Sequence, residues 1–271
     1  MDVKMIYRKK VISPFDLFTL NKIFPESKRS QITVFIVITI TIIAIVIIIF
    51  VSNTEKNKEL EIQPINDFVQ NCLFENGEES IFLIGETGGY VIPPEPSLEQ
   101  SIAYYLHDNK NYMPSKEKIE NEISSYIDIL LPFCINGFEN FPEYIITENS
   151  LTTQTRIEDE KVVLDLDYPL SITKGSNTYQ IDMFSAEVPA RLGIIYNAIT
   201  EAMNNQMERT DSICASCLYD IGEKYNLYFH VLDTNETEIL LIIVRDENSK
   251  ILDEDYKFNY AIKLDFGENE N

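Results

Sequence analysis

The residues best suited to chemistry in this chain are its four cysteines, two of which stand close together in Cys214-Ala-Ser-Cys217. Thr210, Asp211 and Ser212 precede this C-x-x-C pair and are typical N-cap residues, so we expect the pair at the start of a helix. A thiolate at that position is stabilised by the helix dipole. One interpretation of Cys214 and Cys217 is therefore a thiol–disulfide exchange site.

The other interpretations of the cysteines are structural. An even number of cysteines outside the cytoplasm favours disulfides, and of the three possible pairings we favour Cys72–Cys134 with Cys214–Cys217. The first bridge would pin two helices and close a loop of about sixty residues, which is worth roughly 4 kcal/mol on the loop-entropy model. A zinc site would need ligands from distant segments to complete a set of four. No thioredoxin-like βαβ pattern precedes the C-x-x-C pair, so structural disulfides are preferred.

The remaining chemistry-bearing residues carry no catalytic pattern. His107 and His230 are the only histidines, and both are expected as half-buried residues of strands. The glycine-rich run Gly85-Glu-Thr-Gly88-Gly89 follows a predicted helix, whereas a phosphate-binding loop precedes one. Neither a nucleophile elbow nor an H-E-x-x-H motif occurs. We therefore predict no catalytic residue, no cofactor and no metal ligand, and expect the protein not to be an enzyme.

The most distinctive element of the chain is the apolar stretch Ile32–Val51. It contains no charge and no proline, and Thr33, Thr39 and Thr41 are its polar residues. Twenty helical residues cover roughly 30 Å, the thickness of a bilayer's hydrocarbon core. The stretch therefore predicts a transmembrane helix with membrane lipid as its partner.

Charge divides sharply across this stretch. Residues 1–30 hold seven basic and three acidic residues, a net +4, whereas residues 54–271 hold 15 basic and 41 acidic residues, a net −26. Basic residues remain on the cytoplasmic side of a span, so the N-terminus is expected inside and the C-terminal domain outside the cell membrane. Such an acidic domain argues against nucleic acid as a partner, because phosphate binding requires a basic surface.

The junction before the apolar stretch reads Lys28-Arg29-Ser30-Gln31-Ile32-Thr33. A basic pair, a small residue, Gln-x-Thr and a long aliphatic run resemble the class III signal peptide of archaeal type IV pilin-like proteins. The resemblance implies cleavage between Ser30 and Gln31 and an apolar helix that packs into a filament core or stays in the membrane. An uncleaved signal anchor is the alternative. The exterior domain also resembles a recurrent family of anchored archaeal proteins, which implies no activity.

The rest of the chain predicts an α+β fold. Helices are expected from Pro64 to about Ile84, from Ser115 to Pro132, over Pro189–Met207 and over Ser212–Lys224. In the second of these, Ser115 is the expected N-cap, and the expected buried stripe includes Ile119, Ile123, Ile127 and Leu131. Lys174–Asn177 is expected as a hairpin turn. Strands are expected over the alternating segments Ser101–His107, Tyr144–Arg156, Lys161–Ile172, Thr178–Val188, Asn226–Asp233, Glu238–Arg245 and Tyr256–Asp265.

Four regions follow from these elements. They are a basic arm or leader (1–30), a transmembrane helix (31–53), a helical membrane-proximal lobe (54–142) and an ectodomain with an antiparallel sheet and packed helices (143–271). Asn235-Glu-Thr237 is the single N-x-S/T sequon, which makes Asn235 a candidate glycosylation site.

The function expected from the sequence is that of a single-pass surface protein, pilin-like or anchored, for adhesion, self-assembly or binding of a protein partner. The alternative is an extracytoplasmic thiol–disulfide oxidoreductase that uses Cys214 and Cys217.

Overall fold

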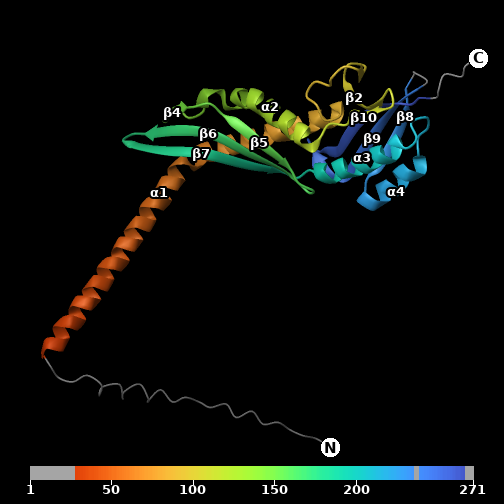
Figure 1. Ribbon diagram of the computed structural model, residues 1–271. Helices are drawn as coiled ribbons and strands as arrows, with labels where there is room; N and C mark the ends of the chain where they lie inside the picture. Colours follow the sequence, from red (N-terminus) through yellow and green to blue (C-terminus); the bar gives the residue numbers. More distant parts are fainter. Residues whose placement is uncertain (1–27, 235–237, 266–271) are drawn as a thin grey trace, which may run out of the picture. The chain divides into compact units, whose positions relative to one another are not determined.

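The computed structural model describes residues 28–234 and 238–265, and for residues 28–34 and 50–60 it describes the backbone alone. The chain divides into two compact units, residues 1–57 and 58–271. Helix α1 (Lys28–Thr87) contributes residues to both units (Figure 1). Within the part of the chain that the structure describes, no helix has an apolar stretch long enough to cross a membrane.

The described part of the first unit is the N-terminal portion of α1. Every residue from Phe35 to Ile49 is exposed. Thr39 and Thr41 donate their hydroxyl hydrogen bonds to the carbonyl oxygens of Phe35 and Ile38, each over 2.8 Å. These threonines therefore satisfy their polar groups within the helix itself.

In the second unit, α1 and α2 (Lys116–Ile135) run antiparallel and form a disulfide-linked pair. Cys72 of α1 bonds Cys134 near the C-terminus of α2. Toward the other end of the pair, the backbone amide of Val91 donates to Glu122 over 2.7 Å. The predicted cap of α2 is confirmed, because the Ser115 hydroxyl accepts from the Lys118 amide over 3.1 Å.

A mixed sheet forms one part of the second unit, which corrects the expectation of purely antiparallel pairing. Its order is β1-β2-β10-β9-β8, with β3 paired to β2. Strands β2 and β10 are parallel, while the other pairs are antiparallel. The strands are β1 (Ser97–Leu98), β2 (Ile102–His107), β3 (Lys110–Asn111), β8 (Tyr228–Asp233), β9 (Ile239–Ile251) and β10 (Glu254–Lys263). Pairing of β2 with β10 joins strands about 150 residues apart in sequence, a contact that local pattern does not encode.

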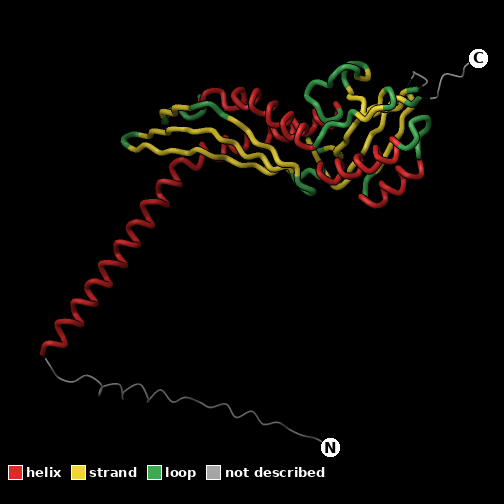
Figure 2. Tube along the Cα trace, viewed as in Figure 1, coloured by secondary structure: helices red, strands yellow, loops and turns green. Residues whose placement is uncertain are grey.

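A second, antiparallel sheet contains β4 (Ile145–Glu148), β5 (Thr152–Ile157), β6 (Val162–Lys174) and β7 (Asn177–Val188) (Figure 2). Strands β4 and β5 pair with successive parts of β6, and β7 pairs along nearly all of it. The single strand expected over Tyr144–Arg156 is thus interrupted, because the register against β6 shifts between β4 and β5. The predicted hairpin turn at Lys174–Asn177 is confirmed, with Gly175 at φ +60°.

The remaining helices are the short 3₁₀ helix η2 (Asn136–Phe138), α3 (Leu192–Met207) and α4 (Ala215–Tyr225). One large core holds residues from α1, α2, α3, α4 and both sheets, so segments 54–142 and 143–271 contribute to it together. Pro64 and Pro132 lie inside α1 and α2 rather than at their ends. The second unit is therefore an α+β domain with a mixed sheet and an antiparallel sheet.

Helix α1 approaches each sheet at a glycine. A β-carbon at Gly77 would meet Leu164 of β6, and one at Gly85 would meet the Lys257 carbonyl of β10. The helix continues through Gly85, which the sequence suggested as part of its end, and Gly88 and Gly89 follow with positive φ angles of 79° and 91°.

Candidate functional site

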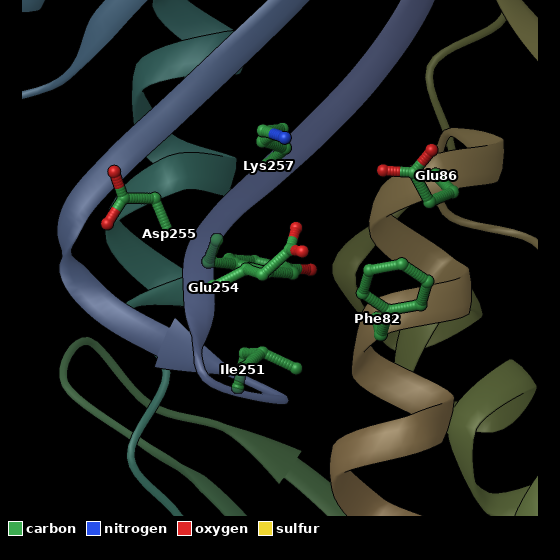
Figure 3. Close-up of a pocket in the computed structure, with 7 residues that line it drawn as sticks. Phe82, Glu86, Ile251, Glu254, Asp255 and Lys257 are labelled. Carbon is green, nitrogen blue, oxygen red and sulfur yellow. The ribbon is translucent and has the colours of Figure 1, made fainter.

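A shallow pocket of about 240 Å³ lies between the end of α1 and the β9–β10 hairpin. Phe82 and Glu86 of α1 and Glu254 of β10 face this space, whereas Asp255 points away from α1 (Figure 3). Glu86 accepts from the Asn259 side-chain amide over 3.4 Å, and Asp255 pairs with Lys250. The charged residues of the lining are Glu86, Glu254, Asp255 and Lys257. Among the described residues, no group of acidic, histidine or cysteine side chains could hold a metal ion.

The cysteines form two disulfides, Cys72–Cys134 and Cys214–Cys217, which is the pairing favoured above. Their sequence separations are 62 and 3 residues. On the loop-entropy model, closure of the long loop stabilises the fold by about 4 kcal/mol and closure of the short loop by about 2 kcal/mol. Two disulfides are consistent with an extracytoplasmic domain, because such bonds persist in oxidising compartments.

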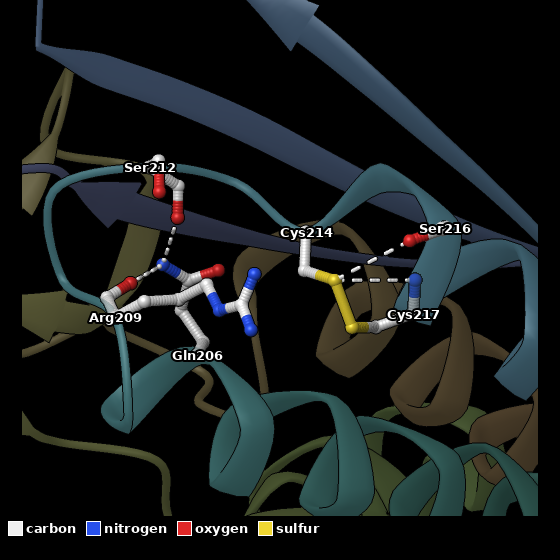
Figure 4. Close-up of a disulfide and its surroundings, with 6 residues drawn as sticks. All are labelled: Gln206, Arg209, Ser212, Cys214, Ser216 and Cys217. Atoms are coloured by element: carbon white, nitrogen blue, oxygen red, sulfur yellow. Dashed lines mark hydrogen bonds between the residues drawn. A yellow bond between two sulfur atoms is a disulfide. The ribbon is translucent and has the colours of Figure 1, made fainter.

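The Cys214–Cys217 disulfide spans the first turn of α4 (Figure 4). Cys214 is the N-cap in place of the expected Thr210, Asp211 or Ser212, because α4 begins only at Ala215. The Cys214 sulfur accepts from the Cys217 backbone amide over 3.3 Å. The Ser216 hydroxyl oxygen lies 3.7 Å from the same sulfur. Both cysteines are half-buried, while Ser216 between them is exposed.

A buried glutamine holds the loop that leads to this disulfide. Gln206 is 5% exposed and donates through Nε2 to the carbonyl oxygens of Arg209 (2.8 Å) and Ser212 (3.0 Å) (Figure 4). Thr210 accepts from the backbone amide of Asp265 over 2.9 Å. No motif in the sequence pointed to Gln206. Gln206 follows Met203 by three residues, and this helical spacing could have indicated that Gln206 lies on the same buried face of α3.

An ion pair fixes the opposite end of α4. The Arg191 guanidinium donates through Nη1 to Asp246 over 2.7 Å and through Nη2 to the Tyr225 carbonyl over 2.9 Å. Asp246 is fully buried and also accepts from the Ser249 hydroxyl over 2.6 Å. The network joins the start of α3, the end of α4 and a bulge in β9, and nothing in the local sequence around Arg191 or Asp246 pointed to it.

The other residues considered from the sequence lie apart from this disulfide or cannot be placed. His107 is half-buried on β2, as expected, and lies 3.2 Å from Asp108. His230 is exposed rather than half-buried, because β8 pairs with β9 alone and covers little of it. Ser30 and Gln31 lie in the helical backbone of α1. Asn235 falls outside the described residues.

The chain matches no family model, no curated protein and no solved structure.

Proposed function

We propose that this chain is a single-pass membrane protein that holds its α+β domain outside the cell membrane for adhesion, assembly or binding of a protein partner. The observation that supports the proposal is the surface of α1 between Phe35 and Ile49. Twelve large hydrophobic residues in this segment have exposed fractions of 48% to 71%. Each exposed aliphatic side chain costs on the order of 1 kcal/mol in water, a cost that lipid removes.

The charge distribution supports an N-inside orientation. The segment before the apolar stretch is net +4 and the segment after it is net −26. Lys28 and Arg29 stand four and three residues before Ile32 at the start of that stretch. The two disulfides belong to the acidic domain, which agrees with an oxidising compartment on that side.

Two forms of this proposal differ in the fate of residues 1–30. In the pilin-like form, cleavage between Ser30 and Gln31 releases an apolar helix that packs with other copies in a filament. In the anchored form, the basic arm remains attached and the helix stays in the bilayer. Intact-mass measurement of protein purified from native membranes distinguishes them, because the pilin-like chain begins at Gln31.

Membrane extraction tests the anchor itself. We expect the wild-type chain to remain in the membrane pellet after an alkaline wash. Ile43→Lys combined with Ile47→Lys should release it, since each lysine costs roughly 3 kcal/mol at the centre of a span. The matched control, Ile43→Leu with Ile47→Leu, should stay in the pellet. Release of the wild-type chain by the wash would overturn the proposal.

Protease accessibility tests the orientation. Protease added to intact cells should digest the acidic domain and leave the basic arm protected. Protection of residues 58–271 in intact cells would contradict an exterior domain, whatever the outcome of the extraction.

A further inference from the structure

We propose that Cys214–Cys217 is a thiol–disulfide exchange site for a dithiol of a partner polypeptide, whereas Cys72–Cys134 is a permanent crosslink. The two bonds differ in what they join, in exposure and in the groups that surround the sulfur atoms. This inference is independent of the membrane anchor, because it concerns the second unit alone.

The two bridges differ first in how much they contribute to holding the fold together. Cys72–Cys134 joins two helices, α1 and α2, through residues 62 positions apart in sequence. Cys214–Cys217 joins residues that already lie on one helical turn. Helix α4 is held without it, since Leu218 and Ile221 are buried and the Tyr225 carbonyl accepts from Arg191. Opening the short bridge therefore leaves the packing of α4 intact.

Access to the sulfur atoms differs as well. Cys72 is 2% exposed and belongs to the core, so Cys134, which is half-buried, is the one sulfur of that bridge near solvent. Cys214 and Cys217 are half-buried, and Ala215, Ser216 and Tyr219 beside them are exposed. Exchange requires the attacking thiolate to reach a disulfide sulfur, and the short bridge meets this requirement in the folded chain.

The surroundings of Cys214 favour the thiolate that reduction produces. The Cys217 backbone amide donates to its sulfur over 3.3 Å, and the Ser216 hydroxyl lies within 3.7 Å. The first turn of α4 carries no acidic residue, although the domain is strongly acidic. The nearest carboxylates along the chain, Asp211 and Asp220, are both exposed to solvent. Amide donors at a helix N-terminus stabilise an anion, which makes Cys214 the nucleophile of the pair.

The exchange balances as a two-electron, two-proton transfer. A thiolate of the partner's dithiol attacks the Cys214 sulfur, which forms a mixed disulfide and releases Cys217 as a thiolate that takes up a proton. The partner's second thiolate then attacks the partner's sulfur atom in the mixed disulfide, and Cys214 leaves as a thiolate that takes up the second proton. The partner dithiol is thereby oxidised to a disulfide, and Cys214–Cys217 is reduced to two thiols.

A redox titration of the full chain in detergent micelles tests the difference between the bridges. The protein is equilibrated in glutathione buffers of increasing reduced fraction, its free thiols are alkylated, and each cysteine peptide is quantified by mass spectrometry. The reducing strength of each buffer is the squared concentration of reduced glutathione divided by the concentration of oxidised glutathione. We expect Cys214–Cys217 to open at a value of this ratio at least about tenfold lower than the value that opens Cys72–Cys134. Opening of both bridges together, or of Cys72–Cys134 first, would overturn the proposal.

Single variants test which sulfur reacts. In Cys217→Ser, the remaining Cys214 should form a mixed disulfide with oxidised glutathione roughly fivefold faster than Cys217 does in Cys214→Ser. Adding Ser216→Ala to Cys217→Ser should slow Cys214, since it removes a donor near the sulfur. Circular dichroism and an intact Cys72–Cys134 bond verify that each variant is folded. Equal rates for Cys214 and Cys217 would eliminate Cys214 as the nucleophile and with it the proposed site.

Discussion

Gly85 of α1 lies so close to β10 that a β-carbon at this position would stand 2.2 Å from the carbonyl oxygen of Lys257. The neighbouring Tyr256 ring is also within 2.9 Å of that point, and its hydroxyl donates to the Ile81 carbonyl of α1 over 3.1 Å. The absence of a side chain at Gly85 thus allows the helix to pack directly against the backbone of the mixed sheet. At Gly77 the helix meets the tip of Leu164 instead.

This difference predicts unequal effects of alanine. Gly85→Ala should lower the free energy of unfolding by about 2 to 3 kcal/mol, because a strand backbone cannot move aside cheaply. Gly77→Ala should change it by less than about 1 kcal/mol, since the Leu164 side chain can rotate and alanine favours the helix. Urea denaturation of both variants measures the effects. Equal losses at the two positions would show that the carbonyl contact is not the cause.

The disulfides should differ in their effect on stability. Replacing Cys72 and Cys134 together by serine should lower the free energy of unfolding by about 4 kcal/mol under non-reducing conditions, because the unfolded chain regains a long loop. Replacing Cys214 and Cys217 together should cost about 2 kcal/mol or less. Denaturation curves of the two double variants provide the comparison, and a greater loss from the short bridge would contradict it.

The ion pair between Arg191 and Asp246 should be costly to break from one side. Arg191→Met leaves the fully buried Asp246 without its cation and should destabilise the fold by about 3 to 5 kcal/mol. Arg191→Met combined with Asp246→Leu should cost less than Arg191→Met alone, because no buried charge remains. Thermal unfolding measures both, and a double variant that loses as much stability as Arg191→Met alone, or more, would contradict this prediction.

As a surface control, Lys161→Ala should leave the unfolding midpoint unchanged, since the Lys161–Glu187 pair is solvent-exposed at both ends.

Three buried tyrosines should make the fold sensitive to alkali. Burial raises the pKa of Tyr105, Tyr256 and Tyr260 above the ordinary value near 10. Because the pKa of these tyrosines is higher in the folded chain, their contribution to the free energy of unfolding is complete below about pH 10. It is lost as pH rises further, because the same tyrosines ionise first in the unfolded chain. Above pH 10, each of these tyrosines should lower the free energy of unfolding by about 1.4 kcal/mol per pH unit.

Urea midpoints from pH 8 to pH 11 measure this loss. Tyr260→Phe should flatten the alkaline fall, because it removes one of the buried hydroxyls whose pKa is raised. A variant with the wild-type pH dependence would exclude Tyr260 as a source.

The sequence predicted those features that depend on interactions between neighbouring residues. Ser115 after Pro114 predicted the cap of α2, and Gly175 in Lys174–Asn177 predicted the β6–β7 hairpin. The stripe Ile119, Ile123, Ile127 and Leu131 predicted the buried face of α2. Each of these features depends on residues within one or two turns of each other, so their chemistry is visible in a short window.

The helix boundaries that the sequence predicted at two prolines are wrong. In the sequence, Pro64 favours a helix start and Pro132 a helix end, yet both helices continue through them. Proline disfavours a helix interior by the loss of one backbone hydrogen bond and a steric clash. Packing of α1 and α2 against the large core and their link through Cys72–Cys134 offset that cost.

The sequence by itself determined the apolar stretch from Ile32 to Val51, the separation of charge around it, the α+β composition and the short distance between Cys214 and Cys217, since each is a property of neighbouring residues. Tertiary structure alone decided that β2 lies parallel to β10, that Gly85 meets Lys257 and that Arg191 reaches Asp246. These contacts join residues 55 to 172 positions apart or strands from opposite ends of the domain, and only packing of one shared core selects them.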